Sequence, residues 1–276
     1  MIGKSCLFAG LLFLYGILFA WQENIQGTTL SRLSYPLPLA AQRVALGYLQ
    51  QLGAEMLFVK ASVFNGGLES GRDPLDYADP LAQHFSASAA LHPQFVDTYF
   101  LCQATLPYIN DEYVRKANEV LAIGTKARPD DFIPPFFHGF NHMYFLNEPL
   151  EAARIFRVAA ARPNGEPLAH LANILAAEGG DVLAALLGLK VMRAAEKSEE
   201  MQRRYDTEIA ALEKAVRVLE AITLYKKENG VPPDQLPDLV PRYLESLPDL
   251  GSIFTLEWQA SHLAVVRKVA RPTVKR

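Results

Sequence analysis

The sequence predicts a mostly helical protein, in which an array of helical hairpins follows an N-terminal transmembrane helix and ends in a small β-hairpin. Three observations predict this fold class. The first is an uncharged apolar run over residues 5–22. The second is a helical pattern that returns every 34 to 36 residues. The third is a change to alternating apolar and polar residues after residue 250, which is typical of strands rather than helices.

The composition limits the class further. The 276 residues carry a formal net charge of -3, and 50% of them are hydrophobic. Such a chain can bury a large core and is not disordered. The lack of a basic excess argues against binding to nucleic acid. Cys6 and Cys102 are too few for a disulfide framework or a four-thiolate zinc site. Cys102 has no basic neighbour, and we expect it to be a small buried core residue.

The N-terminal run is long enough to cross a membrane. At ~1.5 Å per residue, residues 5–22 span about 27 Å, close to the thickness of a bilayer core. Lys4 precedes the run, and Trp21 near its end suits the membrane interface. We therefore expect residues 1–22 to be a single-pass signal anchor in a bacterial cytoplasmic (inner) membrane. The N-terminus would lie in the cytoplasm and the bulk of the chain on the periplasmic side.

Three other interpretations of this run fit less well. A signal peptide cleaved after Ala20 would place Leu18 where a small residue is preferred. A lipoprotein needs its cysteine after the apolar run, whereas Cys6 lies at the start. A buried helix of a soluble protein would show a polar face, and this run has none. Whether the segment is cleaved stays open.

The first part after the anchor is expected to be a linker followed by a helix. Residues 23–38 are polar and rich in turn residues, which predicts a linker. Residues 39–64 have helical periodicity, and Asn65-Gly66-Gly67 is predicted to end the helix. The apolar residues of this segment are Val44, Leu46, Leu49, Leu52, Met56 and Val59.

Prolines mark the starts of the helices that follow. Asp73-Pro74 and Asp79-Pro80 each place an N-cap residue before a proline that can occupy the first turn. Pro135, Pro149 and Pro167 are predicted to lie in first turns in the same way. Helices of about 12 to 15 residues joined by short polar segments predict helical hairpins.

The hairpins repeat within residues 39–197. Pro93, Pro129 and Pro163 lie 36 and 34 residues apart, and each is predicted to close a helix. Before each proline, three residues at relative positions 0, 4 and 7 share one helix face. These sets are Leu81, Phe85 and Ser88; Ala117, Leu121 and Gly124; and Ala152, Phe156 and Ala159. A period near 34 with small residues on the shared face predicts stacked helical hairpins.

The C-terminal third begins with a further hairpin over residues 167–194, turned at Gly179-Gly180. Residues 198–229 form a long amphipathic helix that we expect to cover the last hairpin, with a coiled-coil partner as the alternative. Residues 230–276 predict a small α+β element with a proline-rich loop, a β-hairpin from residues 252–258 and 262–267, and a basic tail.

His138 and His142 are the candidate metal ligands. Their i, i+4 spacing is the one that zinc-binding helices use. Gly139, however, stands where such helices carry a glutamate, and Asp131 and Glu148 are merely nearby in the sequence. The repeat register instead places the two histidines where the first helix of a unit packs on the second, with Gly139 allowing close contact. We therefore expect structural histidines and no cofactor, and leave open whether they bind a metal.

Phe136, Phe140 and Tyr144 are the candidate binding residues. They lie at i, i+4 and i+8 on another face of the same helix. In a superhelix this face lines the concave groove, where aromatic rings can bind a peptide or a partner helix. The alternative is packing against the adjacent repeat. Since we find no phosphate loop, nucleophile elbow or distinctive pair of carboxylates, we expect no catalytic residues, no small-molecule substrate and no enzyme.

Residues 80–195 resemble the tetratricopeptide repeat (TPR) group, and the whole chain resembles bacterial membrane-anchored repeat proteins of largely unknown role. The resemblance lies in GYLQQLGAEMLFVKASVFNGG, HPQFVDTYF, RPDDFIPPFFHGFN and YKKENGVPPDQLPDLVPRYLESLPDLG. It implies a TPR-like superhelix, a scaffold that mediates contact with another envelope protein at the outer face of the cytoplasmic membrane. The Trp and Tyr usual in the first helix of such a repeat are not both present in any unit, which leaves the repeat number open.

Residues 225–256 resemble the end of type II secretion pseudopilins, where a helix leads through a proline-rich loop to a small sheet. This implies an alternative function as a subunit or accessory of a pilus-like or secretion/export assembly. A pseudopilin has a glycine cleavage site and a glutamate at the fifth mature residue, and counting from Gly3 that residue is Phe8. The remaining hypothesis is a metal-dependent envelope enzyme that uses His138 and His142.

Overall fold

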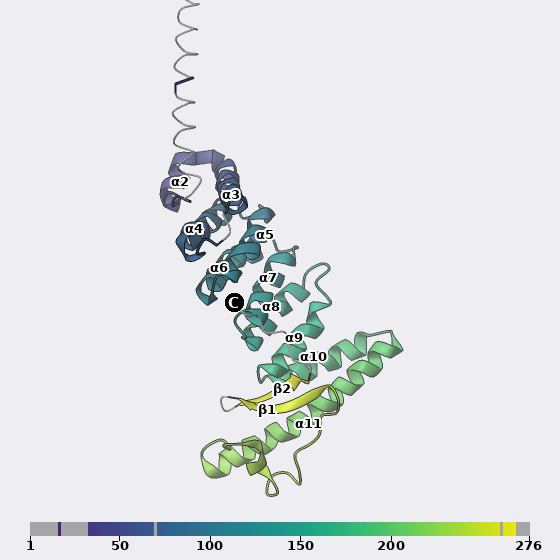
Figure 1. Ribbon diagram of the computed structural model, residues 1–276. Helices are drawn as coiled ribbons and strands as arrows, with labels where there is room; N and C mark the ends of the chain where they lie inside the picture. The colour runs from purple at the N-terminus through teal and green to yellow at the C-terminus, as the bar shows by residue number, and fades with distance from the viewer. Residues whose placement is uncertain (1–15, 18–32, 69–70, 260–261, 269–276) are drawn as a thin grey trace, which may run out of the picture. The chain divides into compact units, whose positions relative to one another are not determined.

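The computed structural model describes residues 16–17, 33–68, 71–259 and 262–268. The chain divides into two compact units, Met1–Ile109 and Asn110–Arg276. Within the described residues both units are built mainly from helices, and the second also holds a two-stranded antiparallel sheet near the C-terminus (Figure 1). The prediction of a mostly helical chain with a small C-terminal β-hairpin is therefore confirmed.

In the first unit, successive helices pack on one another. Ser88 of one helix ties three of them together, because its hydroxyl donates to the carbonyl of Ala54 at 3.0 Å and lies 2.8 Å from the Thr98 hydroxyl. Ala54 and Leu57 pack against Ala87 on the apolar side of this contact. The helices are α2 (Leu39–Leu46), α3 (Gln50–Gly66), α4 (Leu75–Leu91) and α5 (Val96–Thr105), with 3-10 turns η1 (Gly47–Leu49) and η2 (Leu106–Tyr108).

The expected single helix over residues 39–64 is wrong. Gly47 has φ +53°, a left-handed conformation that glycine adopts without steric cost, and it separates α2 from α3. The break turns α2 back along α3, so that Leu46 packs directly over Gly53, where a Cβ atom would overlap the leucine side chain. The helical periodicity of the sequence continues through Gly47, so it did not predict the break, which depends on the left-handed conformation of this glycine.

The expected helix start at Asp79-Pro80 is also wrong. Pro80 lies inside α4, which begins at Leu75 directly after Pro74. Proline normally interrupts a helix because it lacks the N–H group. Here Ala78, Leu81 and Phe85 are fully buried around it, and we infer that their packing outweighs the missing hydrogen bond.

The second unit continues with helices that pack in sequence, each on the next. Pro149 opens one of them, as expected, whereas Pro167 is the residue directly before another and not part of its first turn. Gly179 and Gly180 form the turn of the expected hairpin, and Asp181 then caps the next helix. The helices are α6 (Asp111–Ala127), α7 (Ile133–Tyr144), α8 (Pro149–Ala160), α9 (Leu168–Glu178), α10 (Val182–Ala195) and α11 (Glu199–Asn229).

The residues of the sequence repeat occupy equivalent buried positions on α4, α6 and α8. In each helix the three residues at positions 0, 4 and 7 face inward, and the proline follows just beyond the end of the helix. All nine are buried: Leu81, Phe85, Ser88, Ala117, Leu121, Gly124, Ala152, Phe156 and Ala159. The shared face that the spacing predicts is therefore a packing face.

A side chain 34 residues further along the chain caps the C-terminus of α6. The Arg162 guanidinium donates to the carbonyls of Thr125, Arg128 and Asp131 at 2.6, 2.9 and 2.5 Å. Arg162 and Arg128 hold the same place in the repeat, directly before the closing prolines. The last carbonyls of a helix lack helical partners and carry partial negative charge, which favours a cation there.

We expect Arg162→Met to lower the free energy of unfolding by about 2 kcal/mol, because three carbonyls lose a charged donor while the aliphatic stem is kept. Thermal and urea unfolding followed by circular dichroism would measure the loss. Arg157→Met on the exposed side of α8 is the matched control and should change little. Equal losses in both variants would contradict the capping role.

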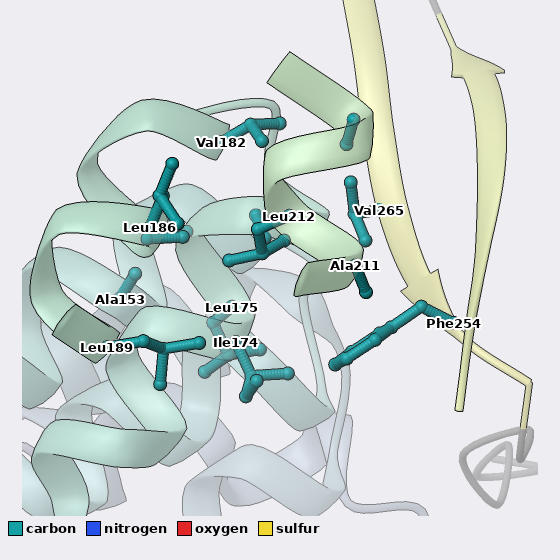
Figure 2. Close-up of a cluster of buried hydrophobic side chains, with 14 of the residues drawn as sticks. Ala153, Ile174, Leu175, Val182, Leu186, Leu189, Ala211, Leu212, Phe254 and Val265 are labelled. Carbon is teal, nitrogen blue, oxygen red and sulfur yellow. The ribbon is translucent and has the colours of Figure 1, made fainter. Parts of the chain in front are cut away.

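The C-terminal sheet packs on the helical array. Strands β1 (Phe254–Gln259) and β2 (His262–Arg267) pair antiparallel, with Leu256 opposite Val265. Phe254 and Val265 join Leu212 of α11 in one buried cluster with residues of α8, α9 and α10 (Figure 2). A second cluster joins Val218 and Ile222 of α11 to the turn η3 (Leu236–Leu239) and to β2.

Several expectations concern residues outside the described part of the chain. The signal anchor over residues 1–22 lies outside it except for residues 16–17, as do residues 23–32 of the linker and residues 269–276 of the basic tail. Among the helices that the structure describes, none is both long and apolar enough to span a bilayer. Cys102 is fully buried, as expected, and burial raises the pKa of its thiol.

Candidate functional site

Helix α7 carries both sets of candidate residues. Its start is fixed by the Asp131 carboxylate, which accepts from the Ile133 backbone N–H at 2.9 Å, and by Pro134 and Pro135 in the first turn. Gly139 faces α8, where a Cβ atom would lie 3.0 Å from the ring of Phe156. The glycine therefore lets α7 and α8 approach closely, as its place in the repeat predicted.

The aromatic candidates form part of a continuous row along α7. The aromatic row consists of Phe132, Phe136, Phe140 and Tyr144, whose successive ring centroids lie 6.5, 6.3 and 5.0 Å apart. Phe140 and Tyr144 are stacked. Contacts between rings at these distances stabilise the row beyond simple burial.

One side of the aromatic row packs inward. Phe136 lies 6.1 Å from Phe156, and both Phe136 and Phe140 pack against the cluster formed with α8, α9 and α10. None of Phe136, Phe140 and Tyr144 is fully buried, however. The aromatic row therefore packs against the adjacent helices and remains partly exposed.

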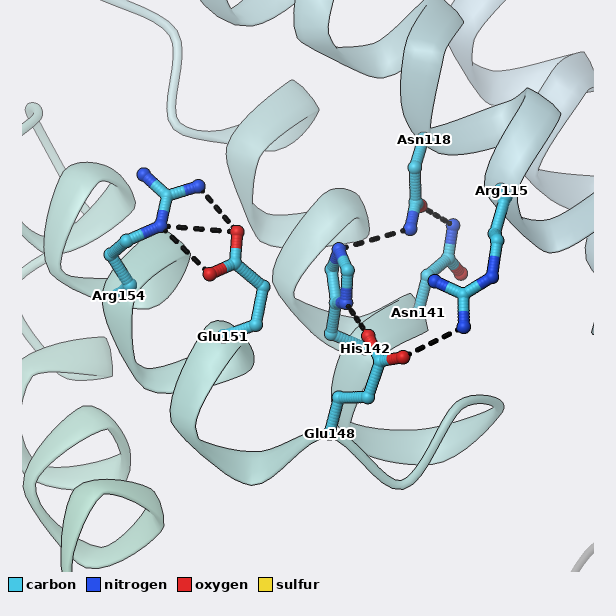
Figure 3. A network of polar contacts seen from close by, with 7 residues as sticks. All are labelled: Arg115, Asn118, Asn141, His142, Glu148, Glu151 and Arg154. Atoms are coloured by element: carbon cyan, nitrogen blue, oxygen red, sulfur yellow. Dashed lines mark hydrogen bonds and ion pairs between the residues drawn. The ribbon is translucent and has the colours of Figure 1, made fainter. Parts of the chain in front are cut away.

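The histidines lie on the side of α7 that faces α6. His142 is buried and uses both ring nitrogens, since Nδ1 lies 2.6 Å from the Glu148 carboxylate and Nε2 lies 3.2 Å from the Asn118 amide (Figure 3). Arg115 donates to the second oxygen of Glu148 at 2.8 Å. Burial raises the pKa of Glu148, but the hydrogen bonds from Arg115 and His142 outweigh this and lower it.

The buried Asn141 sets the direction of this network. Its Nδ2 donates to Asn118 Oδ1 at 2.8 Å, so the Asn118 amide N–H group points to His142. His142 Nε2 then accepts a hydrogen bond and Nδ1 donates to Glu148. The network of Arg115, Asn118, Asn141, His142 and Glu148 joins α6, α7 and the start of α8, and it is satisfied without a ligand.

His138 lies beside this network. Its ring centroid is 5.2 Å from that of His142. Burial, with the nearby His142, lowers the pKa of His138 to about 4, which keeps it neutral at physiological pH. Both histidines line a shallow hollow of about 290 Å³ with Arg115 and Glu119 of α6.

The spacing of the two histidines alone does not make a metal centre. The described residues contain no group of three His, Cys, Asp or Glu side chains suited to hold a metal ion. A metal at His142 would have to replace its hydrogen bond to Glu148 or to Asn118. Of the two residues that His142 contacts directly, only Glu148 lies close to it in the sequence, and Asn118, 24 residues away, gave no signal that a spacing rule could detect.

A second polar cluster joins α9, α11 and β2. The Glu208 carboxylate is buried, accepts from His170 at 2.6 Å and from Arg204 at 3.4 Å, and lies 3.9 Å from Arg267. Burial raises the pKa of Glu208, but the His170 hydrogen bond and the two nearby cations outweigh it and hold the pKa below 4.5. No sequence pattern identified this cluster, whose outermost members, His170 and Arg267, lie 97 residues apart.

Comparison of the chain with protein-family models, with curated proteins and with solved structures finds no match. The candidate sites therefore stand on the geometry of this chain alone.

Proposed function

We propose that the protein is a TPR-like helical-repeat scaffold that binds another protein through the aromatic row of α7. The observation that carries this proposal is the row itself, because Phe136 and Phe140 anchor it in the core while Tyr144 continues it beside them. Rigid aromatic rings with an accessible edge are common anchors in protein interfaces. The repeated packing face on α4, α6 and α8 supports the repeat assignment.

The proposed location of the protein is the bacterial cytoplasmic membrane. Residues 5–22 would hold the scaffold at the cytoplasmic membrane, with the helical array on the periplasmic side and an envelope protein as partner. The apolar length of this run and the aromatic residue at its end support the assignment. The Asn118–His142–Glu148 network has the role of fixing α7 against α6, so that the aromatic row is presented in one orientation.

Photo-crosslinking tests the binding surface. A photoreactive phenylalanine analogue at Tyr144 should yield an adduct with a distinct partner protein in intact cells, because the row would contact the partner there. The same analogue at Tyr108, which is 62% exposed and outside the row, is the matched control and should yield none. Adducts from neither position, or the same adducts from both, would contradict the proposal.

A second candidate function is supported by the C-terminal element. The order of long helix, proline-rich segment and antiparallel hairpin is present as α11, η3 and β1–β2, and it is the order that the resemblance to pseudopilins implies. On this alternative, the protein is an accessory of a pilus-like or secretion assembly. Identification of the Tyr144 adduct by mass spectrometry separates the two, since only the alternative requires a secretion component.

A further inference from the structure

An exposed apolar stripe runs along α3 in the first unit. The α3 seam consists of Leu52, Met56, Val59 and Val63 of α3, together with Leu49 at the end of η1 directly before it, and these side chains are 45–55% exposed. The opposite side of α3 is already used, since Ala54, Leu57 and Ala61 are buried. Within the described residues, the seam stays about half exposed, although Met56 at its edge also lines a pocket with Tyr35 and Leu46. Five large apolar side chains in one row are unusual on a free surface.

The spacing of the seam is that of a coiled coil. Successive members lie 3, 4, 3 and 4 residues apart, which is the a and d pattern of a heptad repeat. This assigns Leu49, Met56 and Val63 to a positions and Leu52 and Val59 to d positions. A helix that only packs within a globular domain needs no strict 3.5-residue repeat. The seam therefore fits a second helix that packs along α3.

The charges beside the seam identify that second helix. Glu55 lies at a g position and Lys60 at the following e position, and both are exposed. Within the described part of the chain, the Glu55 carboxylate lies 4.0 Å from His92 Nδ1, which is long for an ion pair. In a parallel pair, a g residue faces the e residue five positions further along the partner helix. Glu55 of each copy then faces Lys60 of the other.

An antiparallel pair lacks this match. It would bring g positions opposite g positions and e positions opposite e positions, so that glutamate meets glutamate and lysine meets lysine. Like charges across an interface are costly and suppress that arrangement. The charge pattern of α3 is thus complementary to itself in the parallel orientation.

We infer that the α3 seam is a homodimer interface, in which α3 of two copies packs in parallel with reciprocal Glu55–Lys60 ion pairs. A two-heptad helix would be too short to form such a pair by itself in water. Here α3 is already held helical by its packing on α4, so association does not have to order the helix. This inference concerns the first unit and does not depend on the function proposed for α7.

Disulfide trapping in the full-length protein tests the seam. In a Cys6→Ser background, where Cys102 is buried, we would introduce Leu52→Cys or Val59→Cys and oxidise the protein in its native membrane. In each variant most of the protein should form a disulfide-linked dimer, because in a parallel pair a d residue faces the same d residue of the other copy. Gln51→Cys, exposed on α3 but outside the seam, is the matched control and should stay monomeric. An antiparallel pair would instead bring d residues opposite a residues of the partner, so neither variant would form a disulfide with its own copy.

Charge exchange gives a second readout. Lys60→Glu should raise the dissociation constant of the detergent-solubilised protein at least about tenfold, because it places like charges across the interface. The exchanged variant with Glu55→Lys and Lys60→Glu should restore dimerisation. Monomers from both seam cysteines, dimers from Gln51→Cys in equal yield, or no restoration in the exchanged variant would each overturn the inference. Monomers from the seam cysteines would be the result if another segment of the same chain covered α3.

Discussion

Replacing Gly139 by leucine is expected to lower the free energy of unfolding by about 3 kcal/mol. A Cβ atom at this position would already lie 3.0 Å from the Phe156 ring, and leucine adds three further carbon atoms. Overpacking of this kind typically costs 1–3 kcal/mol, occasionally more. Leucine favours a helix over glycine by about 1 kcal/mol, but this gain is smaller than the cost of displacing a ring that is fully buried.

The loss can be assigned to the contact between α7 and α8. Equilibrium unfolding in urea would be compared with that of Gly66→Leu, where nothing lies within 4 Å of the added Cβ atom and where we expect no loss. The double variant Gly139→Leu with Phe156→Ala should lose less than the sum of the two single changes, because removal of the ring makes room for the leucine. Additive losses would contradict the assignment.

The second large effect is expected at Glu208. We expect Glu208→Gln to lower the free energy of unfolding by about 3 kcal/mol at neutral pH, because a buried carboxylate loses its charge between His170, Arg204 and Arg267. Three elements, α9, α11 and β2, meet at this carboxylate. The variant should therefore also loosen the C-terminal sheet, which hydrogen exchange of the β2 amides would detect.

The stabilisation that Glu208 provides depends on pH. The folded-state pKa of Glu208 is lowered from 4.5, so the folded state binds its proton less readily than the unfolded chain does. The stabilisation is fully present above the unfolded pKa and is lost as the pH falls through the folded pKa. As the pH falls through 4.5 and below, the wild-type protein should therefore lose more stability than Glu208→Gln. Asp206→Asn is the control: Asp206 also lies on α11 but forms an exposed pair with Arg193 of α10, so this change should alter the slope less.

The faces of the repeated helices could be predicted from the sequence because they depend on local spacing. Leu81, Phe85 and Ser88 lie on one side of a helix regardless of what surrounds it. The closing prolines set the ends of the helices in the sequence repeat. The same argument holds for the β-hairpin, where alternation over two short segments predicted the strands, and for Gly139, whose lack of a side chain indicated close contact.

The polar clusters could not be predicted in this way. His142 finds Asn118 24 residues away, and Glu208 finds His170 38 residues away. Which polar groups meet depends on the rotation and offset of packed helices. The periodicity of a single helix carries no information about either. A metal site and a structural network share the same i, i+4 histidine spacing, and only the partners of the second ring nitrogen separate them.

The predominance of helices, the shared packing faces and the C-terminal hairpin were thus determined by the sequence itself, through periods that the backbone geometry of helices and strands imposes. The tertiary structure decided the break at Gly47, the continuous helix through Pro80 and the polar contacts of His142 and Glu208. It also decided that the apolar residues of α3 remain exposed, because whether a face is covered depends on where every other element packs. Residues 39–64, predicted as one helix, therefore form two helices because of the break at Gly47, and the seam on α3 stays exposed because no described element packs fully over it.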